Sequence, residues 1–595
     1  MSKHSYNSAI VGNCAFIAHV ATDTNISWMC WPKFDSSFIF GSLLDNEKGG
    51  EFSILPDNEK YSSTQSYVEN TNILSTRIEC EEGSYTITDF APRFSQYDRD
   101  YKPLMLIRKI QPENGTPSIR IKCRPMADYG KSTLKAVNGS NHIKFLGLDN
   151  EIRLTTNISL NYILDEDSIV LNETKYLVLT YGAPLEAPLE TTSESFLRRT
   201  TRYWRHWVKT ITISNYQQEA VIRSALALKI HQYEDTGAII ASSTTSLPES
   251  PGSGRTWDYR YCWLRDTYYT LNAFNNIGHF EEMERYFHYI ANISTKSSNH
   301  RLQPLYTITG KPDIKEIELD LKGYQGNTPV RIGNQAYEHI QNDVYGQVLV
   351  SLLPLYIDRR FIHSERTESH TVVNKMLNKI EQTIDEKDAG LWEFRNFSQS
   401  HSYTFLFHWA GSNAAEKIAL KLNDNEMLKK ASELKFKAAE KIRQCWDKDR
   451  NVYTQAIETK NLDASTLQLI MMGFLDNNSQ EAKNHLVALE KELKTKDGLF
   501  YRYKHKDDFG EPETTFLICA FWYVEALACV GRLDEAIEYF ENLLKYRNHV
   551  GLLSEDVHFK DGSQWGNFPQ TYSHVGLLNA AYRIAKKQDK PDFCC

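Results

Sequence analysis

The stretch Val372-Val-Asn-Lys-Met-Leu-Asn-Lys-Ile-Glu-Gln-Thr-Ile384 decides the fold class of most of this chain. Its apolar residues Val372, Met376, Ile380 and Ile384 recur at every fourth position, which is typical of a helix with one buried face. The same period governs the chain from about residue 216 onward, whereas it is absent before residue 190. The sequence therefore predicts a helical C-terminal part that follows a part of another class.

Twelve stretches with this period follow residue 216, and no internal sequence repeat links them. Helices in this number, joined by short loops, predict six helical hairpins closed as an (α/α)6 barrel. An open helical solenoid is the alternative, but a solenoid would show a fixed period of roughly 34 or 40 residues, which this chain lacks. The expected helices are 216–233, 262–277, 279–297, 336–357, 366–385, 402–421, 425–447, 462–475, 480–493, 512–530, 532–546 and 571–587.

The chain before residue 190 consists of short alternating or β-branched runs separated by turn residues. Strand-length runs repeated this closely predict a β-sandwich. An aromatic stripe surrounded by Arg and Lys then predicts a helical linker that packs between the two parts. The expected fold is multidomain, with a β-sandwich at 1–190, a helical linker at 191–215 and an (α/α)6 barrel at 216–590.

The bulk composition limits the classes of partner. The chain has 595 residues, a formal net charge of −8 and a pI near 6.2, so it lacks the basic stripe needed to bind nucleic acid. Aromatic residues make up 12% and suit stacking on sugar faces, so a neutral carbohydrate is the expected ligand. Ten scattered cysteines predict reduced thiols rather than a zinc site.

Neither a targeting segment nor a membrane span is visible in the sequence. The first residues lack an apolar signal core, and no run approaches the roughly 18 apolar residues of a spanning helix. We therefore expect a cytoplasmic protein without a membrane partner. The sequence leaves its oligomeric state open.

Two glutamates lie in similar surroundings, Glu393 within Asp388-Ala-Gly-Leu-Trp-Glu-Phe-Arg395 and Glu555 within Val550-Gly-Leu-Leu-Ser-Glu-Asp-Val557. Glycoside hydrolysis requires such a pair of carboxyl groups, one as the acid and the other as the base or nucleophile. The pair alone is weak evidence, because the chain has 76 acidic residues and most are solvated. In the predicted barrel the two residues follow the fifth and eleventh helices, which places both on the same rim.

The string Arg255-Thr-Trp-Asp-Tyr-Arg-Tyr-Cys-Trp-Leu-Arg-Asp266 leads into the second expected helix. Arg265 and Asp266, beside aromatic residues such as Trp257 and Tyr261, are suited to binding one sugar ring. The Arg would donate hydrogen bonds to adjacent hydroxyl groups and the Asp would accept them. A buried ion pair that only holds the loop explains the two residues equally well.

Five ordered motifs together resemble glycoside hydrolase family 15, which contains glucoamylases and α,α-trehalases. The resemblance covers almost the whole chain, since the N-terminal part is similar to the trehalase-like domain that precedes the barrel in prokaryotic members. The motifs are the string at 255–266, Pro329-Val-Arg-Ile-Gly-Asn-Gln335 with Asn342-Asp-Val-Tyr-Gly346, Leu391-Trp-Glu393, Gly551-Leu-Leu-Ser-Glu555, and Phe568-Pro-Gln-Thr-Tyr-Ser-His-Val-Gly576.

The resemblance implies roles for single residues. Glu393 would be the general acid and Glu555 the general base of an inverting reaction, with the carboxyl groups roughly 6.5–9.5 Å apart to admit a water. Arg265 and Asp266 would grip the non-reducing glucose.

Further residues would complete the sugar site. Arg502 and Tyr503 resemble a second substrate-binding pair, and Trp392 would stack on a sugar face. Trp392 and Phe394 are expected to form an apolar wall beside the acid, and Arg395 to point away from it or bind substrate.

A cofactor or catalytic metal is not expected. His401, His408, His558 and His574 lie near the motifs, but their spacing matches no metal-ligand set such as His-Glu-X-X-His. Hydrogen-bonded structural histidines are the better interpretation, with His574 as a residue that could help to orient Glu555.

The expected function is that of an inverting, exo-acting α-glucosidase that releases β-D-glucose from maltooligosaccharides or starch-like substrates. The alternative within the family is an α,α-trehalase that hydrolyses trehalose to glucose. A more distant alternative is a glycoside phosphorylase, in which phosphate replaces water, and a third is a sugar-binding protein without catalysis. A substrate panel and a search for glucose 1-phosphate separate these hypotheses.

Overall fold

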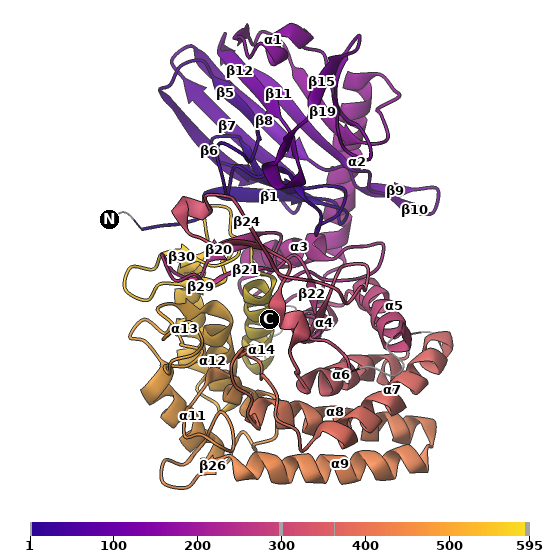
Figure 1. The fold of residues 1–595 in the computed structure, drawn as a ribbon, viewed down its shortest axis with the longest axis vertical. Coiled ribbons are helices and arrows are strands. Elements are labelled where there is room, and N and C mark those ends of the chain that lie inside the picture. Colours follow the sequence, from indigo (N-terminus) through magenta and orange to yellow (C-terminus); the bar gives the residue numbers. More distant parts are fainter. Residues whose placement is uncertain (1–2, 297–300, 362, 589–595) are drawn as a thin grey trace, which may run out of the picture.

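The computed structural model describes residues 3–296, 301–361 and 363–588. Figure 1 shows a sheet-rich part formed by the first third of the chain above a helix-rich part formed by the rest. The last strand of the sheet-rich part, β19, ends at Tyr181, and the first helix of the helix-rich part, α3, begins at Gln218. The predicted order, strands followed by helices, is confirmed.

The largest sheet has eight antiparallel strands in the order β15-β16-β17-β19-β11-β8-β7-β6. Its strands alternate between buried and more exposed residues, as in β7, so one face packs on the interior and the other faces outward. The strands are β6 (Tyr61–Tyr67), β7 (Leu74–Cys80), β8 (Gly83–Phe90), β11 (Met105–Gly115), β15 (Lys135–Asn138), β16 (His142–Leu146), β17 (Ile152–Thr156) and β19 (Lys175–Tyr181).

Two smaller sheets pack against the inner face of the large sheet, and β1 contacts β7 and β8. The first three strands of the β1-β4 sheet are buried at every position, because the large sheet covers one side and the helical part the other. The strands are β1 (Ser8–Gly12), β2 (Ile17–Ala21), β3 (Ile26–Cys30) and β4 (Phe38–Phe40) in one sheet, and β5 (Glu51–Pro56), β12 (Ser118–Arg124) and β18 (Ile169–Val170) in the other.

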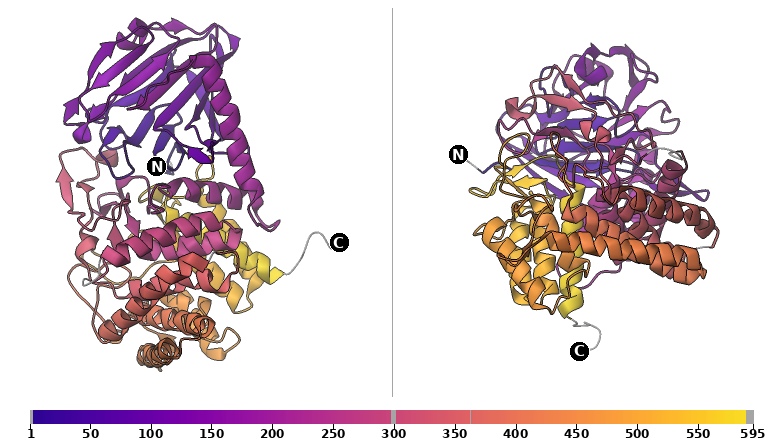
Figure 2. Two further views of the ribbon diagram at one scale, coloured as in Figure 1. Left: turned by 90° about the vertical axis from the view of Figure 1, so that its right-hand side faces the viewer. Right: turned by 60° about the horizontal axis from the view of Figure 1, so that its bottom comes forward.

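Helix α2 (Leu189–Lys209) joins the two parts, and Figure 2 (left) shows it running along the side of the sheets toward the helices. The helix contacts both parts of the molecule. Trp204 is fully buried, and the Trp207 indole N–H donates to Glu282 in α5 at 3.0 Å. On the sheet side, the Thr200 hydroxyl accepts the Arg93 backbone N–H at 3.1 Å.

Twelve α-helices follow residue 216 within the described ranges. Six of them contact one another in a closed cycle, α4 on α6, α6 on α8, α8 on α10, α10 on α12, α12 on α14, and α14 on α4. The helices are α3 (Gln218–His231), α4 (Leu264–Ile277), α5 (Phe280–Lys296), α6 (Asp343–Ile357), α7 (His363–Thr383), α8 (Ser402–Leu422), α9 (Asn425–Gln444), α10 (Gln468–Met471), α11 (Gln480–Leu493), α12 (Leu517–Cys529), α13 (Leu533–Leu543) and α14 (Thr571–Gln588).

Three expected helices are shorter than their periodicity indicated. The one expected at 462–475 is a 3₁₀ turn followed by the four-residue α10, because Gly473 leaves the helical conformation with a φ of 76°. The one expected at 512–530 begins only at Leu517, since Thr515–Phe516 forms β28. The one expected at 336–357 begins at Asp343 after a separate 3₁₀ turn. The residues outside the shortened helices form loops, 3₁₀ turns or the short strand β28.

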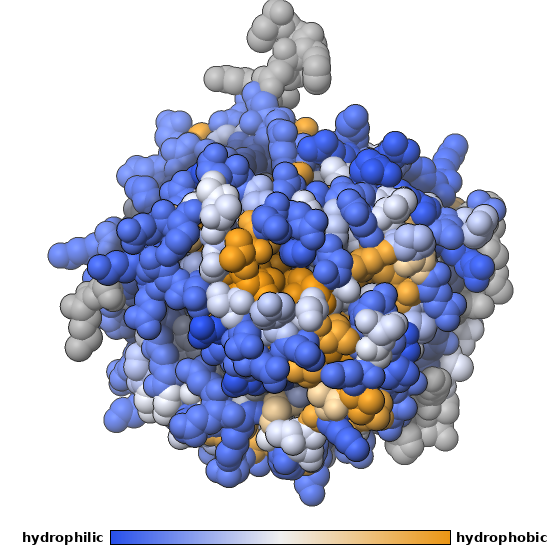
Figure 3. All heavy atoms as spheres, turned by 90° about the horizontal axis from the view of Figure 1, so that it is seen from above, coloured by the Kyte–Doolittle hydropathy of each residue, from blue (hydrophilic) through white to orange (hydrophobic). Residues whose placement is uncertain are grey.

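The outer surface of the sheet-rich part is mostly hydrophilic. Figure 3, which views the molecule from that end, shows several groups of hydrophobic residues from the centre of this face toward its right and lower right. None of the helices in the described part of the chain is long and apolar enough to cross a membrane. The eight cysteines between residues 3 and 588 are unpaired, and all but Cys80 are buried.

Candidate active site

A cavity of about 840 Å³, open to solvent, lies where loops that connect the helices meet. Three loops supply most of the wall, 249–266 before α4, 391–395 after α7, and 502–509 before α12. The wall residues are Ala241, Glu249, Arg255, Trp257, Tyr259, Trp263, Arg265, Asp266, Asn334, Ala336, His339, Leu391, Trp392, Glu393, Phe394, Arg395, Arg502, Tyr503, Asp507, Asp508, Phe509, Phe516, Gln570 and Tyr572.

Glu393 reaches the cavity from a strained turn. Its φ is 62°, in the left-handed region that costs a residue with a side chain roughly 1–2 kcal/mol, and it follows Gly390 with a φ of 68°. All the hydrogen bonds of its carboxyl group within the described residues go to Oε1. The donors are the Trp263 indole N–H at 2.8 Å and the Arg265 and Gln341 side chains at 3.3 Å each. The second oxygen, Oε2, is therefore left for a ligand in the cavity.

Asp388 holds the turn that carries Glu393. Its buried carboxylate accepts the Gly390 N–H at 3.0 Å on one oxygen, and on the other the Asn342 N–H and the Thr404 hydroxyl at 2.9 Å each. Burial and the nearby Asp343 raise the pKa of Asp388 to about 7. These three contacts tie the turn to the start of α6 and to α8.

Glu555 lies at the start of β29 (Asp556–Val557) and is fully buried. Oε1 accepts the Tyr259 hydroxyl at 2.8 Å, and Oε2 accepts the Asn567 backbone N–H at 3.0 Å. Tyr259 lines the cavity, whereas Glu555 is absent from the described wall and lies directly behind that tyrosine.

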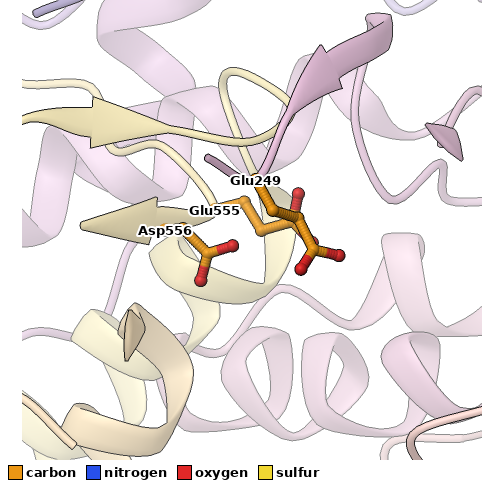
Figure 4. A group of neighbouring side chains, drawn as sticks. All are labelled: Glu249, Glu555 and Asp556. Atoms are coloured by element: carbon orange, nitrogen blue, oxygen red, sulfur yellow. The ribbon is translucent and has the colours of Figure 1, made fainter. Parts of the chain in front are cut away.

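Three carboxyl groups gather at this end of the cavity, as Figure 4 shows for Glu249, Glu555 and Asp556. Each offers an oxygen within 4.8 Å of the others. Burial raises the pKa of Glu555, and the charges of Asp556 and Glu249 raise it further. Burial and Glu249 also raise the pKa of Asp556, whose Oδ2 has no hydrogen-bond partner in the structure.

Two guanidinium groups compensate this negative charge. The Arg502 side chain donates to Glu249 Oε2 at 2.5 Å, and Arg255 lies 3.9 Å from the same oxygen. Burial alone would raise the pKa of Glu249, but Arg502 and Arg255 hold it below its usual range. The three carboxylates are close enough to suit a metal ion, yet the guanidinium groups already supply the positive charge. The arrangement is thus a carboxylate–guanidinium network, in which the two Arg side chains stabilise the ionised form of Glu249.

Arg265 and Asp266 lie side by side in the cavity wall, buried but for 8% and 7% of their surface. Arg265 Nε is 3.3 Å from Asp266 Oδ1, and the same guanidinium donates to Gln341 and Glu393. Burial raises the pKa of Asp266 to about 6 despite the neighbouring Arg265. The two residues form an ion pair, and both also line the cavity. The sequence had left a buried ion pair and a position in the binding site as alternatives.

The structure brings most of the sequence-predicted site residues together. Trp257, Trp392, Arg395, Arg502 and Tyr503 line the same cavity as Glu393. Tyr261 does not line it. Its side chain packs instead in a small apolar cluster with Trp263, at a point where the backbone bends.

The structure does not place the expected apolar wall of Trp392 and Phe394 against the Glu393 carboxyl group. Trp392 lines the cavity, but its indole N–H donates to Asp463 at 3.0 Å, and Phe394 stacks on Phe397. The groups that touch the Glu393 carboxyl are hydrogen-bond donors. The expectation for Arg395 fits the structure better, because its guanidinium pairs with Glu316 at 3.2 Å and lies 4.7 Å from the centre of the Trp257 ring.

Several site residues were missed by the sequence analysis. Glu249 lies in a loop rich in Pro, Gly and Ser, where an isolated acidic residue gives no signal. Tyr259 and Trp263 belong to the string at 255–266, and their spacing of four gave no sign of which carboxyl each would bind. His574 accepts the Leu553 N–H at 3.2 Å and bonds to Ser224, so it holds the chain two residues before Glu555 without touching that carboxylate.

Comparisons with known proteins identify the family. The family model described as glycosyl hydrolases family 15 matches residues 215–582, and the model described as trehalase-like, N-terminal matches residues 6–178. The chain belongs to glycoside hydrolase family 15. It is therefore a glycoside hydrolase that acts on a carbohydrate.

Named relatives of this family 15 enzyme match it along nearly its whole length. A protein named trehalase from Thermoplasma volcanium is 32% identical, covering 96% of this chain and 92% of the relative. Another trehalase, from Mycobacterium tuberculosis, is 28% identical over 96% of this chain and 88% of the relative. A crystal structure of a bacterial glucoamylase complexed with acarbose superposes with a TM-score of 0.73 at 16% identity, covering 98% and 95% of the two chains. At that identity the superposition establishes the fold alone.

Gly566 is the residue against which Glu555 packs. It has a φ of 75°, and a Cβ placed on it would lie 2.5 Å from both Cβ and Oε2 of Glu555. The N-terminal part holds this glycine in place, because the Tyr6 hydroxyl donates to its carbonyl at 2.8 Å. The position of Glu555 thus depends on a glycine fixed by the sheet-rich part.

We expect Gly566→Ala to lose most of its hydrolytic activity, because the new methyl group displaces the Glu555 side chain. Backbone strain and overpacking should also lower the free energy of unfolding by about 2–4 kcal/mol. Gly473→Ala is the matched control, since Gly473 has a φ of 76° with no atom near its Cβ position. A Gly566→Ala enzyme as active as Gly473→Ala would contradict this account of Glu555.

Proposed function

We propose that this family 15 enzyme is an α,α-trehalase that hydrolyses trehalose to two glucose molecules with inversion. The observation that carries the proposal is the pair of carboxyl groups at one cavity, Glu393 with a free oxygen in the wall and Glu555 held behind Tyr259. The choice of trehalose is supported by the curated relatives, which are named trehalase and match nearly the full chain.

Glu393 is suited to the role of the acid by the geometry of its hydrogen bonds. Three donors occupy Oε1, so a proton on the carboxyl group belongs on Oε2, which has no donor of its own. From there it can pass to the oxygen that links the two glucose units, and the leaving sugar departs as a neutral alcohol. Trp263, Arg265 and Gln341 then stabilise the carboxylate that remains.

Glu555 is suited to the role of the base because it receives hydrogen bonds on both oxygens. The Tyr259 hydroxyl and the Asn567 N–H stabilise its ionised form. In an inverting reaction the base removes a proton from the attacking water on the opposite face of the sugar, so no covalent intermediate forms. We expect the two carboxyl groups to stand roughly 6.5–9.5 Å apart in the complex with substrate.

The remaining wall residues fit the binding of sugar hydroxyl groups. Arg265 and Asp266 present a donor and an acceptor next to Glu393, which matches adjacent hydroxyl groups of the glucose that is transferred. Trp257, Trp392, Arg502 and Tyr503 lie in the same wall and are available for the second sugar. No cofactor enters this mechanism.

We also assign the fold in finer terms. The closed cycle of helix contacts supports an (α/α)6 barrel at 216–590, and the large sheet facing two smaller ones supports a β-sandwich at 1–190. Helix α2 falls within the proposed linker at 191–215 except for its first two residues.

A panel of disaccharides tests the substrate. We expect trehalose to be cleaved with a higher kcat/KM than maltose, maltotriose or isomaltose, with glucose as the product. Faster release of glucose from maltose or maltotriose than from trehalose would instead support a glucoamylase-type α-glucosidase. Glucose 1-phosphate formed in phosphate buffer would support a phosphorylase.

Two variants test the role of Glu393 with trehalose as the substrate. Glu393→Gln keeps the shape of the acid but has no proton to give, so its kcat on trehalose should fall by about 10²–10⁴. Glu381→Gln alters an exposed glutamate on the helix that precedes the same turn and should leave kcat unchanged. A Glu393→Gln enzyme within a few-fold of wild type would remove Glu393 as the acid.

The pH dependence of kcat/KM should report the charges around Glu555. Because burial and two carboxylates raise its pKa above the usual 4.5, activity should fall as the pH drops through a midpoint above that value. Asp556→Asn removes a negative neighbour and should move the midpoint to lower pH. Tyr259→Phe removes a donor to the carboxylate and should move it to higher pH.

Opposite shifts in the two variants are the expected result. Midpoints that move in the same direction, or that do not move, would show that a group other than Glu555 controls the acidic limb. Measurements of kcat/KM between pH 3 and 8 with trehalose distinguish these outcomes, because kcat/KM reports the ionisable groups of the free enzyme.

A further inference from the structure

Residues 507–510 form a tight turn in the cavity wall, called the strap below, and its ends Asp507 and Gly510 exchange backbone hydrogen bonds. Asp507 pairs with Arg255 at 2.5 Å and accepts the Tyr503 hydroxyl, and the Gly510 carbonyl accepts a second hydrogen bond from Arg255 at 3.0 Å. Both ends of the strap are therefore fixed to the loop that also carries Glu249.

The middle of the strap is tied to the loop that carries Glu393. Asp508 accepts the backbone N–H of Arg395 at 2.6 Å on Oδ2 and that of Asn396 at 3.2 Å on Oδ1. Arg395 is two residues from Glu393. The strap therefore bridges the loops on either side of the cavity through carboxylates that bind charged groups or backbone amides.

Phe509 is the residue that the strap presents to the cavity. Its ring lies 5.1 Å from the Trp257 ring in an edge-on contact, with the guanidinium groups of Arg255 and Arg395 at 5.4 Å each from its centre. Its backbone N–H donates to Asp507 at 2.8 Å. An aromatic side chain held by two cations and a tryptophan has little freedom to move aside for a ligand.

The exposed fractions show which end of the cavity Phe509 occupies. Arg265 and Asp266 are exposed by 8% and 7%, whereas Phe509 is exposed by 36%. Arg265 and Asp266 thus form the floor and Phe509 the rim, with Glu393 in the wall. The bond to be cleaved must lie beside Glu393, so the sugar on the leaving side points toward the rim.

We propose that the strap ends the cavity after the leaving sugar, and that Phe509 is the residue that confines the substrate to a disaccharide. This inference rests on the proposed function for the direction of the substrate. A third sugar attached to the leaving glucose would have to pass through the space that Phe509 and Trp257 occupy. Selectivity of this kind comes from exclusion of the longer substrate rather than from tighter binding of the shorter one.

A trehalose derivative with one α-1,4-linked glucose added to one ring tests the proposal. Cleavage at the trehalose bond from the unsubstituted side yields glucose and maltose, so maltose reports the longer substrate. The wild-type enzyme should have a much lower kcat/KM for this trisaccharide than for trehalose. In Phe509→Ala the ratio of the two kcat/KM values should rise roughly tenfold or more, because a bulky exclusion is removed.

Two further variants separate exclusion from a general loss of structure. Asp508→Ala frees the strap while keeping the ring, and the ratio should rise in the same direction. Phe436→Ala changes a phenylalanine that is 68% exposed on α9, outside the cavity wall, and should leave the ratio as in wild type. Circular dichroism confirms that each variant folds.

Three results would overturn the proposal. The first is a wild-type enzyme that cleaves the trisaccharide as well as trehalose, and the second is an unchanged ratio in Phe509→Ala. The third is a higher KM for trehalose with an unchanged ratio, which would make Phe509 a binding platform for the second sugar. If trehalose is not hydrolysed but maltose is, the proposed substrate fails, while the ratio for maltotriose over maltose still tests the strap.

Discussion

The structure depends on negative charge buried at one end of the cavity. Glu249, Glu555 and Asp556 lie within reach of one another in the interior, where isolated carboxylates are very costly. Arg502 and Arg255 make the arrangement possible because they fix the charge of Glu249. Tyr259 and Asn567 favour the charged form of Glu555, while Arg502 and Arg255 favour that of Asp556, so part of the cost of burial is offset for each. A network that must hold charges this close needs rigid surroundings.

The sheet-rich part supplies a share of that rigidity. The Trp28 indole N–H donates to the Ser243 carbonyl at 2.7 Å, and Tyr6 holds the carbonyl of Gly566, on which Glu555 packs. Arg260, in the string before α4, donates to the Ser36 carbonyl at 2.7 Å. The N-terminal part therefore acts as a scaffold for the catalytic loops as well as a cover. This also explains why strands β1, β2 and β3 are buried at every position.

The sequence was sufficient for the order of the two parts, for twelve helical stretches and for eight residues of the cavity wall, since periodicity and family motifs are local signals. The path of the loops could not be predicted, because it depends on contacts between residues far apart in the chain. Glu249 is the clearest case, since only the fold brings it to Arg502. Tyr261 illustrates the reverse, because its place in a motif suggested a ligand contact, whereas its side chain packs in an apolar cluster where the backbone bends. The donors around Glu393 likewise come from three separate segments, which the apolar neighbours in its own motif did not indicate.

A single chemical outcome separates this account from its alternatives. Attack by water on the face opposite the leaving group converts one glucose of trehalose to the β-anomer, while the departing glucose keeps the α-configuration. The decisive measurement is the anomer ratio by proton NMR in the first minutes of hydrolysis, before mutarotation. The account predicts equal amounts of α- and β-glucose at the earliest times. Initial release of α-glucose alone would show that a covalent intermediate forms, and would contradict the assignment of Glu393 and Glu555 as the acid and base of an inverting enzyme.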